Sequence, residues 1–233
     1  MNVDEAVAAV RAAVPYLRVA LRPEPDERWL SCAVLSDDPE QMAAVVATTK
    51  AGRGLERDDV ALSLFAQAYA FRIASLAVGT WLLAGVVPDL DPVAMSISLG
   101  RDRPNEVALH EPRRTERSLP DEVLAHLGPF VATAHRASRI GERLLWGNVA
   151  ASCAAAFGAF NEALGTAATR TAFEGFLPSS DLSQYGHIVE REAEPDNGGW
   201  AWQRTNCCLW YQAEGAAGRR CEDCSLNLEE RRA

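Results

Sequence analysis

A chain of 233 residues, 48% of them hydrophobic, is long enough for one large domain with a sizeable core and a small appendage. Its formal net charge of −9 argues against nucleic acid as a partner, because a surface that binds phosphates needs a basic field. The N-terminal stretch is charged and patterned as a helix, without the apolar core of a signal peptide. We therefore expect a cytoplasmic protein whose thiols stay reduced.

The first fifty residues predict two helices around one short strand. Apolar residues recur at helical spacing before and after a turn that is rich in proline and acidic residues. The expected elements are a helix from Asp4 to Leu21, a strand over Trp29–Leu35 and a helix from Pro39 to Lys50.

The next feature is a long apolar stretch from Ala61 to Val87, whose length is sufficient to span a bilayer. Arg72 lies within it, and an arginine at the centre of a membrane costs about 2.5–3.5 kcal/mol. We therefore predict a buried central helix and no transmembrane segment. Asp58 and Asp59 are placed to cap its N-terminus, and Pro88 is expected to end it.

A β-hairpin is predicted in the middle of the chain. Met95, Ile97 and Leu99 alternate with serines, which is typical of a strand with one buried face. Val107 and Leu109 repeat this alternation after a turn that contains Gly and Pro. The two alternating runs therefore predict a pair of antiparallel strands.

Helical patterns follow the hairpin. Ser118 with Asp121, and Thr171 with Glu174, each fit a capping box at the start of a helix. The expected helices run from Ser118 to about Arg136, over residues 139–164, and from Thr171 to a point before Pro178. These elements together predict a helix-rich α+β fold.

The helical periodicity fades after Pro178, where acidic residues, Gly, Pro and Trp are mixed. We predict a mainly helical portion over residues 1–178, which would supply a substrate pocket, and a small C-terminal lobe over residues 179–233. A lobe of this size is too small to be held together by apolar burial alone.

Four of the six cysteines lie within the segment NCCLWYQAEGAAGRRCEDC in this lobe. Cys207 and Cys208 are adjacent, and Cys221 and Cys224 follow after a spacer of twelve residues. The turn of a Cys-x-x-Cys motif brings both sulfurs to one side, so two more thiolates would complete a zinc site or a [2Fe–2S] cluster. A bound metal would also stabilise a segment with little core of its own.

The adjacent cysteine pair favours the cluster, because neighbouring side chains in extended backbone point apart and suit a single small ion poorly. Zinc sites also commonly pair two Cys-x-x-Cys motifs, and this chain has one. Structural zinc and a redox or disulfide role stay open on spacing alone. Residues 214–218, rich in Gly and Ala, would let the backbone approach the metal. Arg204, Arg219 and Arg220 would offset the negative charge of a cluster.

Other residues of interest are aromatic side chains and the remaining thiols. Trp200, Trp202 and Trp210 are candidate walls of a substrate pocket, although packing of the lobe explains them equally well. Cys32, expected in a strand, and Cys153, expected on a helix, are predicted core thiols. The four histidines show no metal-ligand spacing, and no nucleotide, nicotinamide or flavin motif is evident. Electrons would therefore come from a separate donor.

The cysteine motif resembles the C-terminal signature of the FhuF-type ferric-siderophore reductases. The resemblance is strongest over residues 204–224, where an aromatic pair follows the double cysteine, and it is weaker over residues 144–157. The spacer is slightly longer than the family pattern, and Ser225 stands where the family frequently has Pro.

The resemblance implies that Cys207, Cys208, Cys221 and Cys224 hold a [2Fe–2S] cluster, with no catalytic residue beyond it. The implied activity is one-electron reduction of Fe³⁺ in a ferric siderophore of the hydroxamate type, with release of Fe²⁺ in the cytoplasm. A ferredoxin or a flavoprotein reductase would be the external electron donor. Two alternatives remain: a non-enzymatic siderophore-binding or scaffold protein with structural zinc, and a plain iron–sulfur electron carrier.

Overall fold

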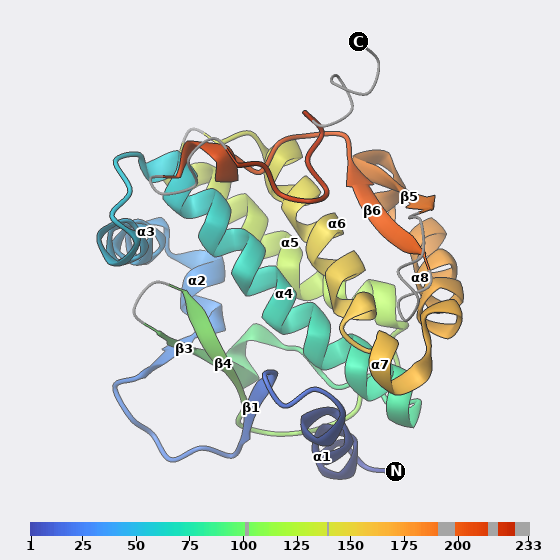
Figure 1. The fold of residues 1–233 in the computed structure, drawn as a ribbon. Helices are drawn as coiled ribbons and strands as arrows, with labels where there is room; N and C mark the ends of the chain where they lie inside the picture. The colour runs from blue at the N-terminus through green and yellow to red at the C-terminus, as the bar shows by residue number, and fades with distance from the viewer. Residues whose placement is uncertain (101–102, 139, 191–198, 214–218, 227–233) are drawn as a thin grey trace.

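The computed structural model describes residues 1–100, 103–138, 140–190, 199–213 and 219–226. It confirms the predicted helix-rich α+β fold, in which the other elements surround one long helix (Figure 1). The helices are α1 (Val3–Ala13), α2 (Cys32–Asp37), α3 (Pro39–Arg53), α4 (Asp58–Ala84), α5 (Leu119–Ala137), α6 (Glu142–Gly158), α7 (Asn161–Leu164) and α8 (Thr166–Ser180). Short 3-10 turns form η1 (Pro92–Ala94), η2 (Leu182–Tyr185) and η3 (Trp210–Gln212).

The described strands form two small sheets. Their bounds are β1 (Arg18–Leu21), β2 (Trp29–Ser31), β3 (Met95–Leu99), β4 (Pro104–Leu109), β5 (Gly186–Glu190) and β6 (Trp200–Arg204). The first sheet has the order β1-β4-β3-β2, and the second pairs β5 with β6 in antiparallel fashion. The predicted hairpin is confirmed, because β3 and β4 are antiparallel with Ile97 opposite Val107. The parallel pairing of β1 with β4 was not predicted.

Helix α4 is the central apolar helix that the sequence predicts to be buried. Its length and composition would allow it to span a membrane. However, 78% of its apolar stretch is buried inside the protein. Helix α6 packs along it, and α1, α3 and α5 cover its other sides. It ends at Ala84, where Gly85 adopts a φ of 64°, three residues before Pro88.

The helix predicted from Asp4 to Leu21 is wrong in its second half. Helix α1 ends at Ala13, and Arg18–Leu21 form strand β1 instead. Pro15 explains the stop, because proline lacks a backbone donor and disfavours helical backbone at the residue before it.

The strand predicted over Trp29–Leu35 is also only partly correct. It ends at Ser31, and Cys32 begins helix α2 rather than lying in a strand. Cys32, Leu35 and Ser36 are buried together, which is the spacing of one helix face.

The helices after residue 139 differ from the prediction in their boundaries. The helix expected over residues 139–164 is divided into α6 and α7, and α8 begins at Thr166, so Thr171 lies inside it. Gly165, with a φ of 84°, makes the turn between α7 and α8. Pro178 lies near the end of α8 and does not stop it, because a proline there removes one hydrogen bond of a helix that is about to end. The predicted cap of α5 is confirmed, since the Asp121 amide donates to Ser118 Oγ over 3.3 Å.

The described residues after position 178 lie against the helical portion (Figure 1). Strands β5 and β6 pack on α6, and η3 packs on α4. Trp202 and Leu182 belong to the same buried cluster as Phe157 and Phe173. The division of the chain at residue 178 stays a prediction, and most of the mixed segment that suggested it, residues 191–198, lies outside the described residues.

A buried histidine joins α4, α5 and the loop before η1. His126 is 1% exposed, its Nδ1 donates to the Leu90 carbonyl over 2.5 Å, and its Nε2 accepts from the Tyr69 hydroxyl over 2.7 Å. Burial lowers the pKa of His126 from 6.5 to about 4, because the imidazolium would lose its hydration.

This burial predicts a specific loss of stability in acid. As pH falls from about 6.5 to 4, the unfolded chain binds a proton that the folded protein does not accept, which destabilises the fold by about 3 kcal/mol. The difference in free energy of unfolding between wild type and His126→Gln should therefore shrink by about 3 kcal/mol between pH 7 and pH 4 in urea titrations. For the exposed His187, the His187→Gln difference should stay nearly constant. A constant difference for His126→Gln would contradict the expectation.

Candidate metal centre

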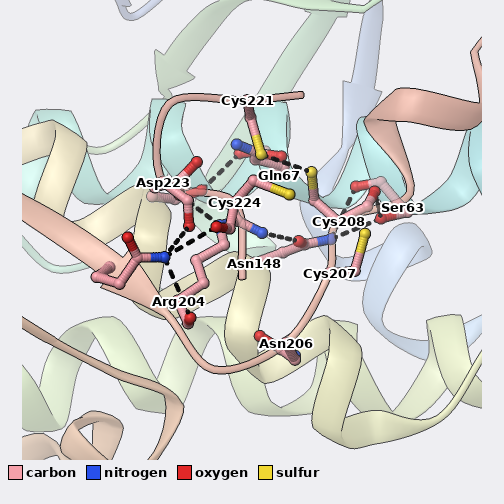
Figure 2. A network of polar contacts seen from close by, with 12 residues as sticks. Ser63, Gln67, Asn148, Arg204, Asn206, Cys207, Cys208, Cys221, Asp223 and Cys224 are labelled. Carbon is pink, nitrogen blue, oxygen red and sulfur yellow. Dashed lines mark hydrogen bonds and ion pairs between the residues drawn. The ribbon is translucent and has the colours of Figure 1, made fainter. Parts of the chain in front are cut away.

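The four motif cysteines lie at one end of the α4–α6 pair. Cys207 and Cys208 follow strand β6, and Cys221 and Cys224 return on the next described segment (Figure 2). The sulfurs of Cys208 and Cys221 are 3.4 Å apart. In Figure 2 the sulfurs of Cys208, Cys221 and Cys224 are drawn beside one another, and the Cys207 sulfur is drawn apart from them on the other side of Cys208. The sequence motif thus corresponds to a local gathering of thiols.

The two described cysteine segments are tied together by a buried polar network. Ser63 on α4 donates its hydroxyl to the Cys208 carbonyl over 2.7 Å. Asn148 on α6 donates its amide to the Ser63 hydroxyl over 2.9 Å and to the Ser63 carbonyl over 3.0 Å. Arg204 Nη1 in turn donates to Asn148 Oδ1 over 2.8 Å. Ser63, Asn148 and Arg204 are each 0% exposed, so the backbone of the double cysteine is fixed from the protein interior.

Arg204 extends the network to the second cysteine segment. Its Nε forms an ion pair with the Asp223 carboxylate, and its backbone amide donates to the Asp223 carbonyl over 3.1 Å. Gln203 Nε2 donates to the Cys224 carbonyl over 3.0 Å. Strand β6 therefore holds the Cys-x-x-Cys segment by both backbone and side-chain bonds. Arg204 Nη2 is buried and has no hydrogen-bond partner among the described residues.

The residue before the double cysteine is seated against a glycine of α6. Asn206 Nδ2 donates to the Arg143 carbonyl over 2.7 Å, close to Gly147. A Cβ atom on Gly147 would stand 2.1 Å from Asn206 Oδ1, which is closer than any side chain allows. Only glycine at this position permits the observed contact between the helix and the loop.

The chain turns sharply after the double cysteine. Leu209 has a φ of 64°, in the left-handed region that costs a non-glycine residue about 1–2 kcal/mol. Its amide donates to Cys207 Sγ over 3.3 Å. The left-handed conformation of Leu209 and this hydrogen bond together fix the position of the Cys207 side chain.

The local environment gives the thiols different proton affinities. The pKa of Cys208 is lowered to about 6, first by a hydrogen bond from the Cys221 thiol and then, against burial, by the charge of Arg204. The pKa of Cys221 is raised, because losing its proton would leave two thiolates in contact. Burial raises the pKa of Cys207. Cys208 is therefore the thiol that ionises most readily of these three.

The distances between the cysteine sulfurs differ from those of a closed metal site. Two thiolates on one tetrahedral metal stand about 3.8 Å apart when each metal–sulfur bond is about 2.3 Å. The 3.4 Å between the sulfurs of Cys208 and Cys221 is longer than the roughly 2.05 Å of a disulfide and somewhat shorter than this ligand separation, and it corresponds to a hydrogen bond between the two thiols. Among the described residues, however, no three His, Cys, Asp or Glu side chains are grouped so that they would hold one metal ion. Four cysteines are a suitable ligand set for a metal bound by thiolates. The closest contact among them joins two sulfurs, and the described residues form no closed site for a single ion.

The remaining cysteines lie in the core, away from this site. Cys32 and Cys153 are each 0% exposed, and burial raises the pKa of each to about 12. Of the arginines predicted to offset cluster charge, Arg204 is fully buried beside the thiols, and Arg219 and Arg220 are exposed. Most of the Gly- and Ala-rich spacer, residues 214–218, lies outside the described residues.

The three candidate wall tryptophans occupy two different surroundings. Trp210, 37% exposed, lines a cavity of about 340 Å³ together with Cys208 and Cys221. Trp200 stacks on Phe173 at 5.4 Å, and Trp202 meets the same ring edge-on at 5.5 Å. Both also line a second cavity of about 270 Å³. Trp210 is therefore the tryptophan that stands beside the thiols.

Ser63 and Gly147 were missed by sequence reasoning. No motif marks a serine on an apolar helix or a glycine within a helix as part of a metal centre. A polar residue in an otherwise apolar helix is the one signal available for Ser63. Asn148, on the largely apolar helix α6, lies at the centre of the network.

Comparison with known proteins adds no family. No known family profile matches the chain, and no curated protein is detectably similar in sequence.

The seat of Asn206 predicts a glycine requirement. Gly147→Ala should destabilise the protein by about 1–3 kcal/mol, because the new methyl group displaces Asn206 from α6. The free energy of unfolding and bound iron per chain would both be measured. A Cβ on Gly128 of α5 meets nothing within 4 Å, so Gly128→Ala should stabilise the protein by about 0.5–1 kcal/mol. Equal stabilisation by both substitutions would refute the proposed seat.

The buried arginine predicts a second effect. Arg204→Met should cost about 3–5 kcal/mol, because the Asp223 carboxylate and the Asn148 amide oxygen lose their shared partner. Arg170→Met, which removes an arginine from a solvent-facing pair with Glu174, should change stability little. Urea titration compares the two variants. Similar losses for both would show that Arg204 does not organise the site.

Proposed function

We propose that this chain is a ferric-siderophore reductase in which Cys207, Cys208, Cys221 and Cys224 hold a [2Fe–2S] cluster. The single observation that carries the proposal is the meeting of the Cys-Cys and Cys-x-x-Cys segments at one place, with Cys208 and Cys221 sulfurs 3.4 Å apart. The resemblance of this motif to the FhuF-type signature supports the same assignment.

The all-thiol donor set favours iron–sulfur chemistry over oxygen-ligated metals. When bound, a [2Fe–2S] cluster would supply one-electron redox chemistry at a potential near about −400 mV for the plant type. A [2Fe–2S] cluster would also offer two iron atoms to the thiols, which suits cysteines that form no single-ion site among the described residues.

The protein residues would keep the site in a fixed arrangement. Ser63 and Asn148 hold the double cysteine from the core, and Arg204 links it to Asp223. A buried guanidinium beside thiolates also stabilises negative charge, since Coulomb interactions are strong where water is excluded. These contacts favour ligands that move little when an electron arrives or leaves.

The substrate side of the proposal rests on the surroundings of the thiols. Trp210 and the cavity of about 340 Å³ beside Cys208 give a compact chelate a place near the thiols. Siderophore-bound Fe³⁺ would gain one electron and leave as Fe²⁺, which oxygen chelators hold far less tightly. The electron would come from a ferredoxin or a flavoprotein reductase, since the sequence has no nucleotide or flavin motif.

The proposal predicts iron release from a siderophore. Protein purified without oxygen should contain iron and acid-labile sulfide, and after reduction it should convert ferric hydroxamate to Fe²⁺ captured by a chromogenic trap. Cys224→Ala should lose sulfide and activity. Cys153→Ala should keep both, because its thiol lies in the core.

Two results would replace the proposal with one of its rivals. Colourless protein with one zinc per chain and no sulfide would favour a siderophore-binding or scaffold protein. A reduced cluster that several siderophore classes fail to oxidise, while a free ferredoxin oxidises it, would favour an electron carrier.

A further inference from the structure

The cavity beside the thiols has an unusual charge. It is lined by α4 residues such as Gln67 and Phe71, by Ser152 and Ala155 of α6, by Trp210, and by two arginines, Arg53 and Arg103. No Asp or Glu is among the described residues that line it. The whole chain carries 32 acidic and 23 basic residues, so two arginines and no carboxylate among the described lining residues oppose the overall charge.

Further positive charge stands behind Arg103. Arg72 on α4 donates to the Tyr16 carbonyl over 2.9 Å and is half-buried. Its pKa is lowered by burial and then by the charges of Arg103 and Arg18, which places these guanidinium groups within electrostatic reach of one another. Arg72 and Arg18 therefore add positive charge near Arg103, one of the two arginines that line the cavity.

The neighbouring cavity provides an internal comparison. The two cavities share Gln67 and Ala155 as lining residues, so they are adjacent. The second contains Glu222 and Asp223 and, among the described residues, no arginine or lysine. Of these two cavities, the positive one is lined by cysteines of the motif, and the acidic one is not.

Size and surface further limit the ligand. A volume of about 340 Å³ lies near the lower end of the range of about 300–1,000 Å³ for small-molecule sites. Leu64, Ala68 and Phe71 give one wall an apolar surface, and the arginines supply planar donors suited to carboxylates. The fitting ligand is compact, partly apolar and negatively charged.

We propose that this cavity binds a ferric chelate that keeps a net negative charge, with a carboxylate near Arg103 and Arg53 and the metal near Cys208 and Cys221. The inference rests on the proposed reductase function and names its substrate class more narrowly. Carboxylate-bearing hydroxamates meet the description, whereas neutral trihydroxamates lack the group that the arginines would bind.

The test uses gallium chelates, because Ga³⁺ imitates Fe³⁺ in size and charge but is not reduced. A citrate-based dihydroxamate keeps negative charge on Ga³⁺, and a cyclic trihydroxamate becomes neutral. Calorimetry on the cluster-bearing protein should show tighter binding of the anionic chelate, weakening as salt rises. Arg103→Gln should weaken it about tenfold, as expected for loss of a charge-assisted hydrogen bond, and should leave the neutral chelate unchanged.

A matched variant separates local from general charge effects. Arg113→Gln removes the same charge from an exposed loop that does not line the cavity and should leave binding unchanged. Equal binding of the two chelates, or equal effects of Arg103→Gln and Arg113→Gln, would overturn the inference.

Measuring binding and reduction separately distinguishes a wrong substrate class from a wrong proposed function. If the anionic gallium chelate binds as expected but its ferric counterpart is not reduced, the cavity assignment stands and the reductase function fails. If the neutral chelate alone binds and its ferric form is reduced, the function stands and the inferred substrate class is wrong.

Discussion

Arg204 brings a full positive charge into the protein interior, and the arrangement of the cysteine segments depends on how that charge is neutralised. The ion pair with Asp223 fixes the Cys-x-x-Cys segment, and the bond to Asn148 fixes the strand against α6. An uncompensated buried charge costs several kcal/mol, so these partners can hardly separate while the protein stays folded. Because the fold depends on this ion pair, the ion pair also fixes where the two cysteine segments lie.

The network also anchors the site on the two helices that pack at the centre of the core. Ser63 and Asn148 lie on α4 and α6, whose contact forms the centre of the core. The Asn148 amide donates to the Ser63 hydroxyl, and the Ser63 hydroxyl donates to the Cys208 carbonyl. These buried donors therefore have hydrogen-bond partners within the apolar core. A site built in this way is positioned by helix packing rather than by the cysteine segments themselves.

Sequence patterns predicted what depends on neighbouring residues and missed what depends on distant ones. Apolar length identified α4, and alternation identified the β3–β4 hairpin. Strand β1 was missed because its parallel partner β4 lies far away in the chain. The spacing of the cysteines suggested a common site, but nothing in the spacing revealed that Arg204 is buried or that Ser63 supports Cys208.

Gly147 links the stability of helix α6 to the position of the loop that carries Asn206. Glycine within a helix weakens that helix by about 0.5–1 kcal/mol relative to alanine, because the unfolded chain has more freedom to lose. Helix α6 accepts this weakness at the point where Asn206 approaches its backbone. A substitution that stabilises the isolated helix at this position would therefore displace the loop. The distance of closest approach between helix and loop depends on the absence of one carbon atom, the Cβ of residue 147.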